Sequence, residues 1–195
     1  AASVGKVSIV KALLRYVKLG VIVAISAIYA SPAFADTQLP QELSKMDTAP
    51  DSTSLPEKAV FIEKDGSESD LKDLKGQVIL VNLWATWCAP CIEEMPDLDR
   101  LASEMEGKPF RVLALSQDRG GAEIVQEFFD ENGIGHLDVV LDPRGATARA
   151  FGARGLPTSF VIDANGQVIG KLEGTAKWDA DGVIDYFNNL IDAAS

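Results

Sequence analysis

The chain alternates between short apolar runs and segments in which apolar residues recur every three or four positions. Residues 78–85 form a nearly continuous apolar run, which is typical of a strand covered on both faces of a sheet. Apolar side chains then recur at helical spacing, so a helix is predicted over residues 88–105, with a kink at Pro96. Further strands are predicted at residues 59–62, 111–116, 137–141, 158–162 and 167–173, and further helices at residues 122–132, 146–151 and 179–191.

This order of elements predicts an α/β fold with a mixed central sheet and helices on its faces. The turn sequence at residues 163–166 favours a hairpin between the last two strands. In open sheets of this kind, chemistry sits at the carboxyl end of a strand, where a helix begins. Cys88 occupies such a position.

The first 57 residues follow a different pattern. Residues 1–35 contain four basic and no acidic residues, then an apolar run and small residues before Asp36, which is the order of a secretory signal peptide. An N-terminal membrane anchor is the alternative: residues 19–35 are uncharged and would span about 26 Å as a helix, a little short of the roughly 30 Å hydrocarbon core. Residues 36–57 contain three prolines and no sustained apolar period, so we expect a flexible linker or an ordinary extension before a domain at residues 58–195.

Charge and composition narrow the function classes. The chain of 195 residues has 29 acidic and 18 basic residues, a net charge of −11, which argues against nucleic-acid binding because no concentrated basic surface is visible. With 47% hydrophobic residues, one core can form without disulfide support. Both interpretations of the basic N-terminus place the acidic remainder across a membrane, so we expect a periplasmic domain, soluble after cleavage or tethered to the inner membrane.

The candidate chemistry lies in the sequence Trp87-Cys88-Ala89-Pro90-Cys91. A thiol in the first turn of a helix lies near free backbone N–H groups and the positive end of the helix dipole, which favour thiolate over thiol. Cys88 is therefore predicted to be the nucleophile. Cys91 lies three residues later and deeper, where it can attack a mixed disulfide between Cys88 and a substrate. Pro90 is tolerated in the first turn and stiffens it.

Three other interpretations of the cysteine pair stay open. A structural disulfide closing so short a loop would restrict the unfolded chain by only about 2 kcal/mol. A zinc site would need two more ligands, and the chain has one histidine, His136, and no second CxxC sequence. Two buried cysteines without a role are the third. Thiol–disulfide exchange is favoured over all three.

Two stretches carry a resemblance to a known family. The sequence VILVNLWATWCAPCIEEMP at residues 78–96, with GLPTSFVID at residues 155–163, resembles the thioredoxin superfamily and most closely its TlpA/ResA-like branch. The resemblance covers about residues 57–193, and residues 110–151 resemble the strand-helix insert of this branch. It implies a thioredoxin-like mixed central sheet flanked by helices, with that insert.

The resemblance also implies roles outside the CxxC sequence. Pro157 is expected to be a cis-proline that packs against the disulfide and leaves the backbone of Leu156 free to pair with an extended substrate. Glu94 matches the acid of the family's CxxExP pattern and is expected to assist proton movement near Cys91. A favourable charge in the first turns of the helix is the alternative for Glu94. Trp87 is expected at the rim of the site.

Other positions depart from the family pattern or have plain explanations. Asn82 stands where thioredoxin has a buried acid, so proton transfer to the deeper thiol cannot use that group. Ala89 supplies no charge inside the CxxC loop, which leaves the pathway open. Trp84 is expected to pack in the core, Trp178 is expected to have a packing role, and His136 is expected in a loop.

The resemblance implies a periplasmic thiol-disulfide oxidoreductase with no cofactor beyond a redox-active Cys88–Cys91 disulfide. We expect a monomeric reductant of disulfide-bearing proteins of cytochrome oxidase copper-site assembly or cytochrome c maturation, supplied by a membrane thiol-transfer electron donor. The alternatives are a disulfide-forming oxidant on the same fold and a copper-handling assembly protein. A peroxiredoxin-type peroxidase is not expected, because its PxxxTxxC pattern would need proline and threonine where Val81 and Ala85 stand.

Overall fold

The computed structural model describes residues 38–50 and 53–194. The segment interpreted as a signal peptide or membrane anchor, residues 1–35, lies outside the described residues, as does the first part of the expected linker. In the part of the chain that is described, no helix combines the length and apolar character needed to cross a membrane.

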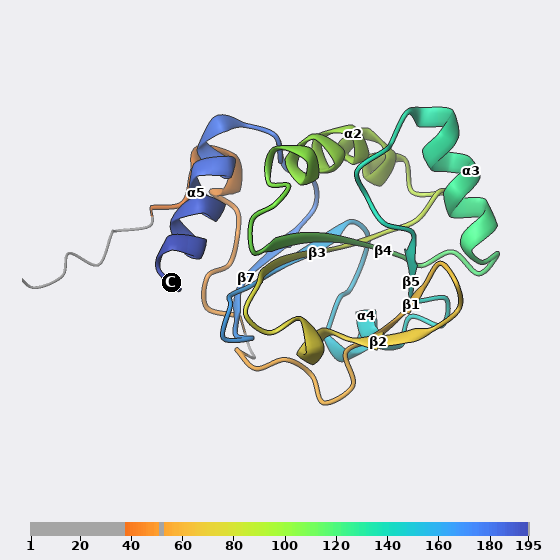
Figure 1. The fold of residues 1–195 in the computed structure, drawn as a ribbon, viewed down its shortest axis with the longest axis horizontal. Coiled ribbons are helices and arrows are strands. Elements are labelled where there is room, and N and C mark those ends of the chain that lie inside the picture. The colour runs from red at the N-terminus through yellow and green to blue at the C-terminus, as the bar shows by residue number, and fades with distance from the viewer. Residues whose placement is uncertain (1–37, 51–52, 195) are drawn as a thin grey trace, which may run out of the picture. The chain divides into compact units, whose positions relative to one another are not determined.

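Within the described residues, seven strands form one mixed sheet in the order β2-β1-β5-β4-β3-β6-β7 (Figure 1). The strands are β1 (Val60–Glu63), β2 (Glu68–Asp70), β3 (Val78–Trp84), β4 (Phe110–Ser116), β5 (Val140–Leu141), β6 (Thr158–Ile162) and β7 (Val168–Glu173). The helices are α2 (Ala89–Glu104), α3 (Ala122–Asn132), α4 (Ala146–Ala150) and α5 (Asp181–Asp192), with 3-10 turns η1 (Gln41–Leu43) and η2 (Leu71–Leu74). This arrangement confirms the predicted fold class.

Strand β3 is an interior strand of the sheet and is buried along its whole length. It runs parallel to β4 and antiparallel to β6. Its side chains alternate between two cores: Leu80 belongs to the core under α2, α3 and α5, while Val81 belongs to the core on the α4 side. Figure 1 shows α2 and α3 on one face of the sheet and α4 on the other. Burial on both faces is the physical reason for the continuous apolar run in the sequence.

Three elements differ from the sequence-based prediction by more than one residue at an end. Strand β2 was not predicted, because Glu68–Asp70 is polar and pairs only at the sheet edge, antiparallel to β1. Strand β5 is shorter than the expected 137–141, since Leu137 and Val139 are buried without being part of the strand. Helix α5 starts at Asp181, two residues later than expected. For β5, the apolar pattern reports burial, whereas the strand depends on backbone pairing.

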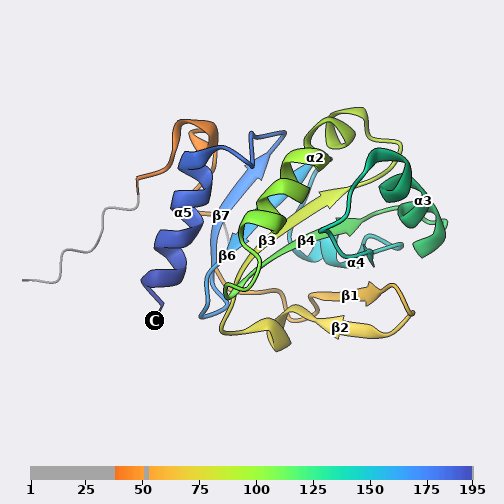
Figure 2. The same ribbon diagram turned by 45° about the horizontal axis from the view of Figure 1, so that its top comes forward.

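Part of the segment expected to be a flexible linker packs against the domain. Leu43 in η1 and Met46 are buried in the same core as α5, which lies beside β7 at one end of the sheet (Figure 2). Asp47 and Lys171 of β7 exchange two backbone hydrogen bonds, both 2.8 Å. Two isolated apolar residues among polar ones and prolines carry no periodic signal, so the sequence did not predict this docking.

Candidate functional site

Cys88 and Cys91 are joined by a disulfide at the start of α2. Cys88 is the N-cap residue of the helix, and Pro90 lies in its first turn, as predicted. The two cysteines differ in exposure: Cys88 is 7% exposed, while Cys91 is fully buried. Only Cys88 therefore presents any surface to a molecule that approaches from solvent.

A buried carboxylate holds the loop that leads into the cysteine pair. Asp118, which follows β4, accepts hydrogen bonds from the backbone N–H of Thr86 at 2.9 Å and from the Thr86 hydroxyl at 2.8 Å. The Ser116 hydroxyl donates to the same carboxylate at 2.8 Å. Asp118 was not predicted from the sequence, where its only signal is its place directly after an apolar strand. It fixes the position of the loop two residues before Cys88.

Two exposed residues flank Cys88, one of them Trp87, which was expected at the rim of the site. Trp87 is 69% exposed, and Pro90 is also exposed. Trp87 is one of two large hydrophobic side chains exposed within the described part of the chain, the other being Ile124 at the start of α3. An exposed aromatic ring next to Cys88 offers an apolar contact to a docking protein.

The Leu156–Pro157 peptide bond is cis, as expected from the resemblance. Thr158, the next residue, pairs with Leu83 near the carboxyl end of β3, so this loop lies at the same end of the strands as the cysteine loop. Leu156 packs against the core that contains both cysteines. A shallow hollow of about 230 Å³ runs along residues 154–158, Glu173 and Gly174.

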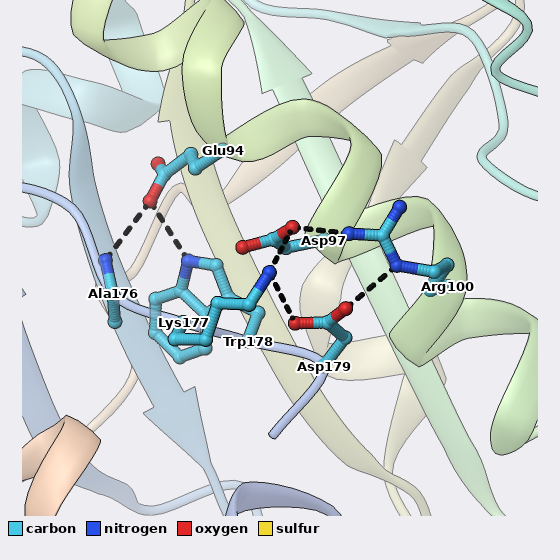
Figure 3. Close-up of polar contacts among 7 residues, drawn as sticks. All are labelled: Glu94, Asp97, Arg100, Ala176, Lys177, Trp178 and Asp179. Carbon is cyan, nitrogen blue, oxygen red and sulfur yellow. Dashed lines mark hydrogen bonds and ion pairs between the residues drawn. The ribbon is translucent and has the colours of Figure 1, made fainter.

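Glu94 lies one turn beyond Cys91 on α2 and is only 3% exposed. Its Oε1 accepts a hydrogen bond from Asn82 Nδ2 at 2.9 Å. Its Oε2 accepts the backbone N–H of Ala176 at 3.2 Å and the indole N–H of Trp178 at 2.8 Å (Figure 3). Every hydrogen bond here comes from a neutral donor, so the carboxylate is buried without a cationic partner in direct contact.

Burial raises the pKa of Glu94 above its ordinary value, because the charged form loses its hydration. The three donors partly oppose this rise, since they stabilise the ionised carboxylate. The negative charge of Asp97 adds to it. The net effect makes Glu94 a better proton acceptor than an exposed glutamate, within one helical turn of Cys91.

Asn82 connects three elements beneath the cysteine pair. Its side-chain amide on β3 donates to Glu94 on α2 and, at 2.9 Å, to the Ser159 hydroxyl on β6. Its Oδ1 is buried and has no hydrogen-bond partner among the described residues. The sequence marked Asn82 as a departure from thioredoxin. It did not show that this amide holds the Glu94 carboxylate.

The family follows from a match that covers most of the domain. The Redoxin family model matches residues 44–186. The chain belongs to the Redoxin family. The match begins at residue 44, within the segment that the sequence assigned to the linker, and it includes Cys88, Cys91, Glu94 and Pro157.

Individual relatives place this Redoxin chain in the ResA/TlpA-like branch. Thiol-disulfide oxidoreductase ResA of Bacillus thuringiensis subsp. konkukian is 34% identical over 115 residues, which is 59% of this chain and 65% of the relative. ResA of Oceanobacillus iheyensis is 33% identical over 144 residues, 74% of this chain and 71% of the relative. The chain thus spans 65% of the length of the first of these curated relatives.

A solved structure shares the fold. A thiol:disulfide interchange protein of the thioredoxin family from Chlorobium tepidum TLS has a TM-score of 0.55 and 29% identity, covering 70% of this chain and 96% of that one. The identification as a ResA/TlpA-like member of the thioredoxin superfamily is confirmed.

Two contacts of this Redoxin site come from a distant segment. Trp178 was expected only to pack, yet its indole N–H and the backbone N–H of Ala176 hold Glu94 from 84 and 82 residues away. A tryptophan between charged residues gives no sequence signal for such a role, and a backbone amide gives none at all.

The described part of the chain contains no group of three or more His, Cys, Asp or Glu side chains placed to hold a metal ion. His136 lies in the loop after α3, as expected, where its backbone N–H donates to Asp99 Oδ1 at 2.7 Å.

Proposed function

We propose that this protein is a thiol-disulfide oxidoreductase that uses the Cys88–Cys91 pair. The observation that carries the proposal is a disulfide at the first turn of α2 with graded exposure, 7% for Cys88 and 0% for Cys91. A nucleophile must be reached by the substrate, whereas the resolving thiol must be reached only by the mixed disulfide. The ResA relatives are themselves named thiol-disulfide oxidoreductases, which supports the same activity here.

The reaction begins in the dithiol form. The Cys88 thiolate attacks one sulfur of a substrate disulfide, a mixed disulfide forms, and one substrate thiolate leaves and takes up a proton. The Cys91 thiolate then attacks the Cys88 sulfur, the mixed disulfide breaks, and the second substrate thiolate leaves and takes up a proton. Two electrons pass to the substrate, and the two protons it gains balance the two lost by Cys88 and Cys91.

Glu94 accepts the proton of Cys91 in the second step. Cys91 is fully buried, so its proton needs a nearby acceptor rather than bulk water. Glu94 is one turn away, and its pKa is raised by burial, which brings its proton affinity closer to that of a thiol. Asn82 holds the carboxylate in place from β3.

The substrate side of the reaction lies at the same edge of the sheet. An extended peptide pairs with the backbone of Leu156, next to the cis-Pro157, and Trp87 and Pro90 form the apolar rim. This assignment is supported by the hollow along residues 154–158 and by the exposure of Trp87.

We assign the protein to the periplasm, as a monomeric reductant of disulfides in proteins of cytochrome oxidase copper-site assembly or cytochrome c maturation. A membrane thiol-transfer protein would return it to the dithiol form. The ResA/TlpA resemblance supports this direction, and the basic, apolar start of the sequence supports export. Other catalysts already form disulfides in such a compartment, so a separate protein of this branch is expected to reduce them.

A trapping experiment tests the activity. In a Cys91→Ser variant, Cys88 should form a stable mixed disulfide with a disulfide-bearing protein, visible on a non-reducing gel and lost on adding dithiothreitol. A Cys88→Ser variant should trap nothing, because the remaining thiol is buried. Equal trapping by both variants, or by neither, would reject the proposed roles.

The reduction potential tests the direction. Equilibration with glutathione should give a value near or below about −200 mV, towards the thioredoxin end of the range. A value near about −120 mV would instead identify a disulfide-forming oxidant on the same site.

A further inference from the structure

The segment between β7 and α5 lies across α2 next to Glu94 (Figure 3). Residues 176–179 alternate in their contacts. Ala176 and Trp178 donate hydrogen bonds inward to Glu94, whereas Lys177 and Asp179 make ion pairs with Asp97 and Arg100 on α2. One short segment therefore contacts both the buried carboxylate and the surface of the same helix.

The ion pairs form a closed cluster of two acids and two bases. Lys177 Nζ lies 2.8 Å from Asp97 Oδ1 and 3.0 Å from Asp179 Oδ1. Arg100 Nε lies 2.6 Å from Asp179 Oδ2, and Arg100 also pairs with Asp97. The two carboxylates are mostly buried, while the two cations are more than half exposed. The cluster thus covers the outer side of the segment but remains open to salt.

The groups that act on Glu94, directly or through Asn82, come from four parts of the chain. Asn82 on β3 and the two donors of residues 176–178 are neutral, and the Ser159 hydroxyl on β6 reaches Glu94 only through Asn82. The negative charge of Asp97 on α2 adds to the rise in the pKa of Glu94. Lys177 and Arg100 make their ion pairs with Asp97.

We propose that residues 176–179 form a latch that closes Glu94 off from water, in which Trp178 is the positioning residue for its carboxylate. The contacts of residues 176–179 support the latch by themselves, whereas its effect on proton transfer from Cys91 rests on the proposed function. The inner layer orients the carboxylate, and the outer ion pairs keep the segment on α2, so the proton acceptor of the site is controlled by a segment more than 80 residues away in sequence.

A tryptophan substitution tests the inner layer. Trp178→Phe removes the indole N–H that stabilises the ionised carboxylate, so the pKa of Glu94, followed by carbon NMR in the oxidised protein, should rise on the order of half a pH unit. The matched control is Trp84→Phe, because Trp84 is also fully buried and its indole N–H donates at 3.0 Å to the Ala114 carbonyl. No rise in Trp178→Phe, or an equal rise in Trp84→Phe, overturns the role of Trp178.

A lysine substitution tests the outer layer and stays informative if Trp178→Phe does not fold. Lys177→Met should speed hydrogen exchange of the Ala176 amide and the Trp178 indole N–H about two- to fivefold at low salt. High salt should produce the same change in the unsubstituted protein. The control Lys171→Met removes the same charge from an ion pair with Glu173 elsewhere. Equal exchange rates in the two variants overturn the latch.

The two proposals fail separately. Both measurements are made on the oxidised protein and need no substrate, so they decide on the latch even if the protein exchanges no disulfides. If the protein does exchange disulfides, the pH at which the exchange rate falls on the acid side should be higher in Trp178→Phe, in step with the raised pKa of Glu94. An unmoved acid limb with a shifted pKa would reject the link to Cys91 alone.

Discussion

Helix α2 carries two buried carboxylates with different hydrogen-bond donors. Glu94 is 3% exposed and Asp99 is 7% exposed. Glu94 receives its hydrogen bonds from a side-chain amide, an indole and one backbone N–H. Asp99 Oδ1 receives three backbone N–H groups, from residues 135–137, at 3.0, 2.7 and 3.2 Å. Similar burial on one helix therefore does not mean a similar environment.

The difference lies in neighbours and donors. Asp99 ties the loop after α3 to α2, because its partners are consecutive backbone groups of that loop. Glu94 lies one turn from Cys91 and is held by side chains of distant segments. A carboxyl that anchors backbone amides should matter for stability, whereas one beside a reacting thiol should matter for rate.

The largest expected effect is on stability. Asp99→Ala should lower the free energy of unfolding by about 3 kcal/mol, because three backbone N–H groups lose their shared acceptor. Urea denaturation measures this loss. The exchange rate of the folded variant should stay within about twofold of the unsubstituted protein. The control variant is Asp138→Ala, because Asp138 is exposed and pairs with Arg111.

Asp99 is misassigned if Asp99→Ala loses exchange activity while remaining as stable as Asp138→Ala. That result would assign both carboxylates to the exchange reaction and contradict the proposed difference between Asp99 and Glu94.

The next effect is on rate. Glu94→Gln keeps the size of the side chain but removes the proton acceptor, so the rate of disulfide exchange near neutral pH should fall about tenfold or more. Stopped-flow measurement of the resolving step gives this rate. Glu93→Gln changes the exposed neighbouring residue and should leave the rate unaltered. A slow Glu93→Gln, or a fast Glu94→Gln, would contradict the assignment.

A pH dependence of stability sharpens the role of Glu94. Its raised pKa means that the folded protein binds this proton more tightly than the unfolded chain. The stabilisation is complete below the ordinary glutamate pKa of 4.5 and is lost as the pH rises through the raised value. The unfolding free energy of the unsubstituted protein relative to Glu94→Gln should therefore fall across this window. A difference that is flat or rises with pH would show that burial does not govern Glu94.

The smallest expected effect comes from Asp97. Asp97→Asn removes the like charge that adds to the rise in the pKa of Glu94, so that pKa should move down. The downward shift of this pKa should be smaller than the upward shift in Trp178→Phe, since the charge of Asp97 affects the pKa of Glu94 less than the Trp178 hydrogen bond does. The same NMR titration detects it, with Asp138→Asn as the control. An upward movement would mean that loss of the ion pairs outweighs loss of the charge.

Much of the fold could be predicted from the sequence because buried positions of strands and helices recur as regularly spaced apolar residues. The apolar run of β3 and the helical spacing of α2 are readable, and so are the hairpin of β6 and β7 and the place of Cys88 where a strand meets a helix. The polar strand β2 and the docking of Leu43 and Met46 left no such record. Edge pairing uses backbone groups, and two isolated apolar contacts have no period.

The sequence by itself determined the chemistry: two cysteines with two residues between them at the start of a helix, and an acid one turn further on. Only the tertiary structure decided the environment of that chemistry. Asn82 on β3 and the segment with Ala176 and Trp178 meet at Glu94 from two distant parts of the chain, and Asp118 reaches Thr86 across 32 residues. The physical reason is that a side chain's reactivity depends on its hydration and its hydrogen-bond donors, and folding assembles both from distant residues.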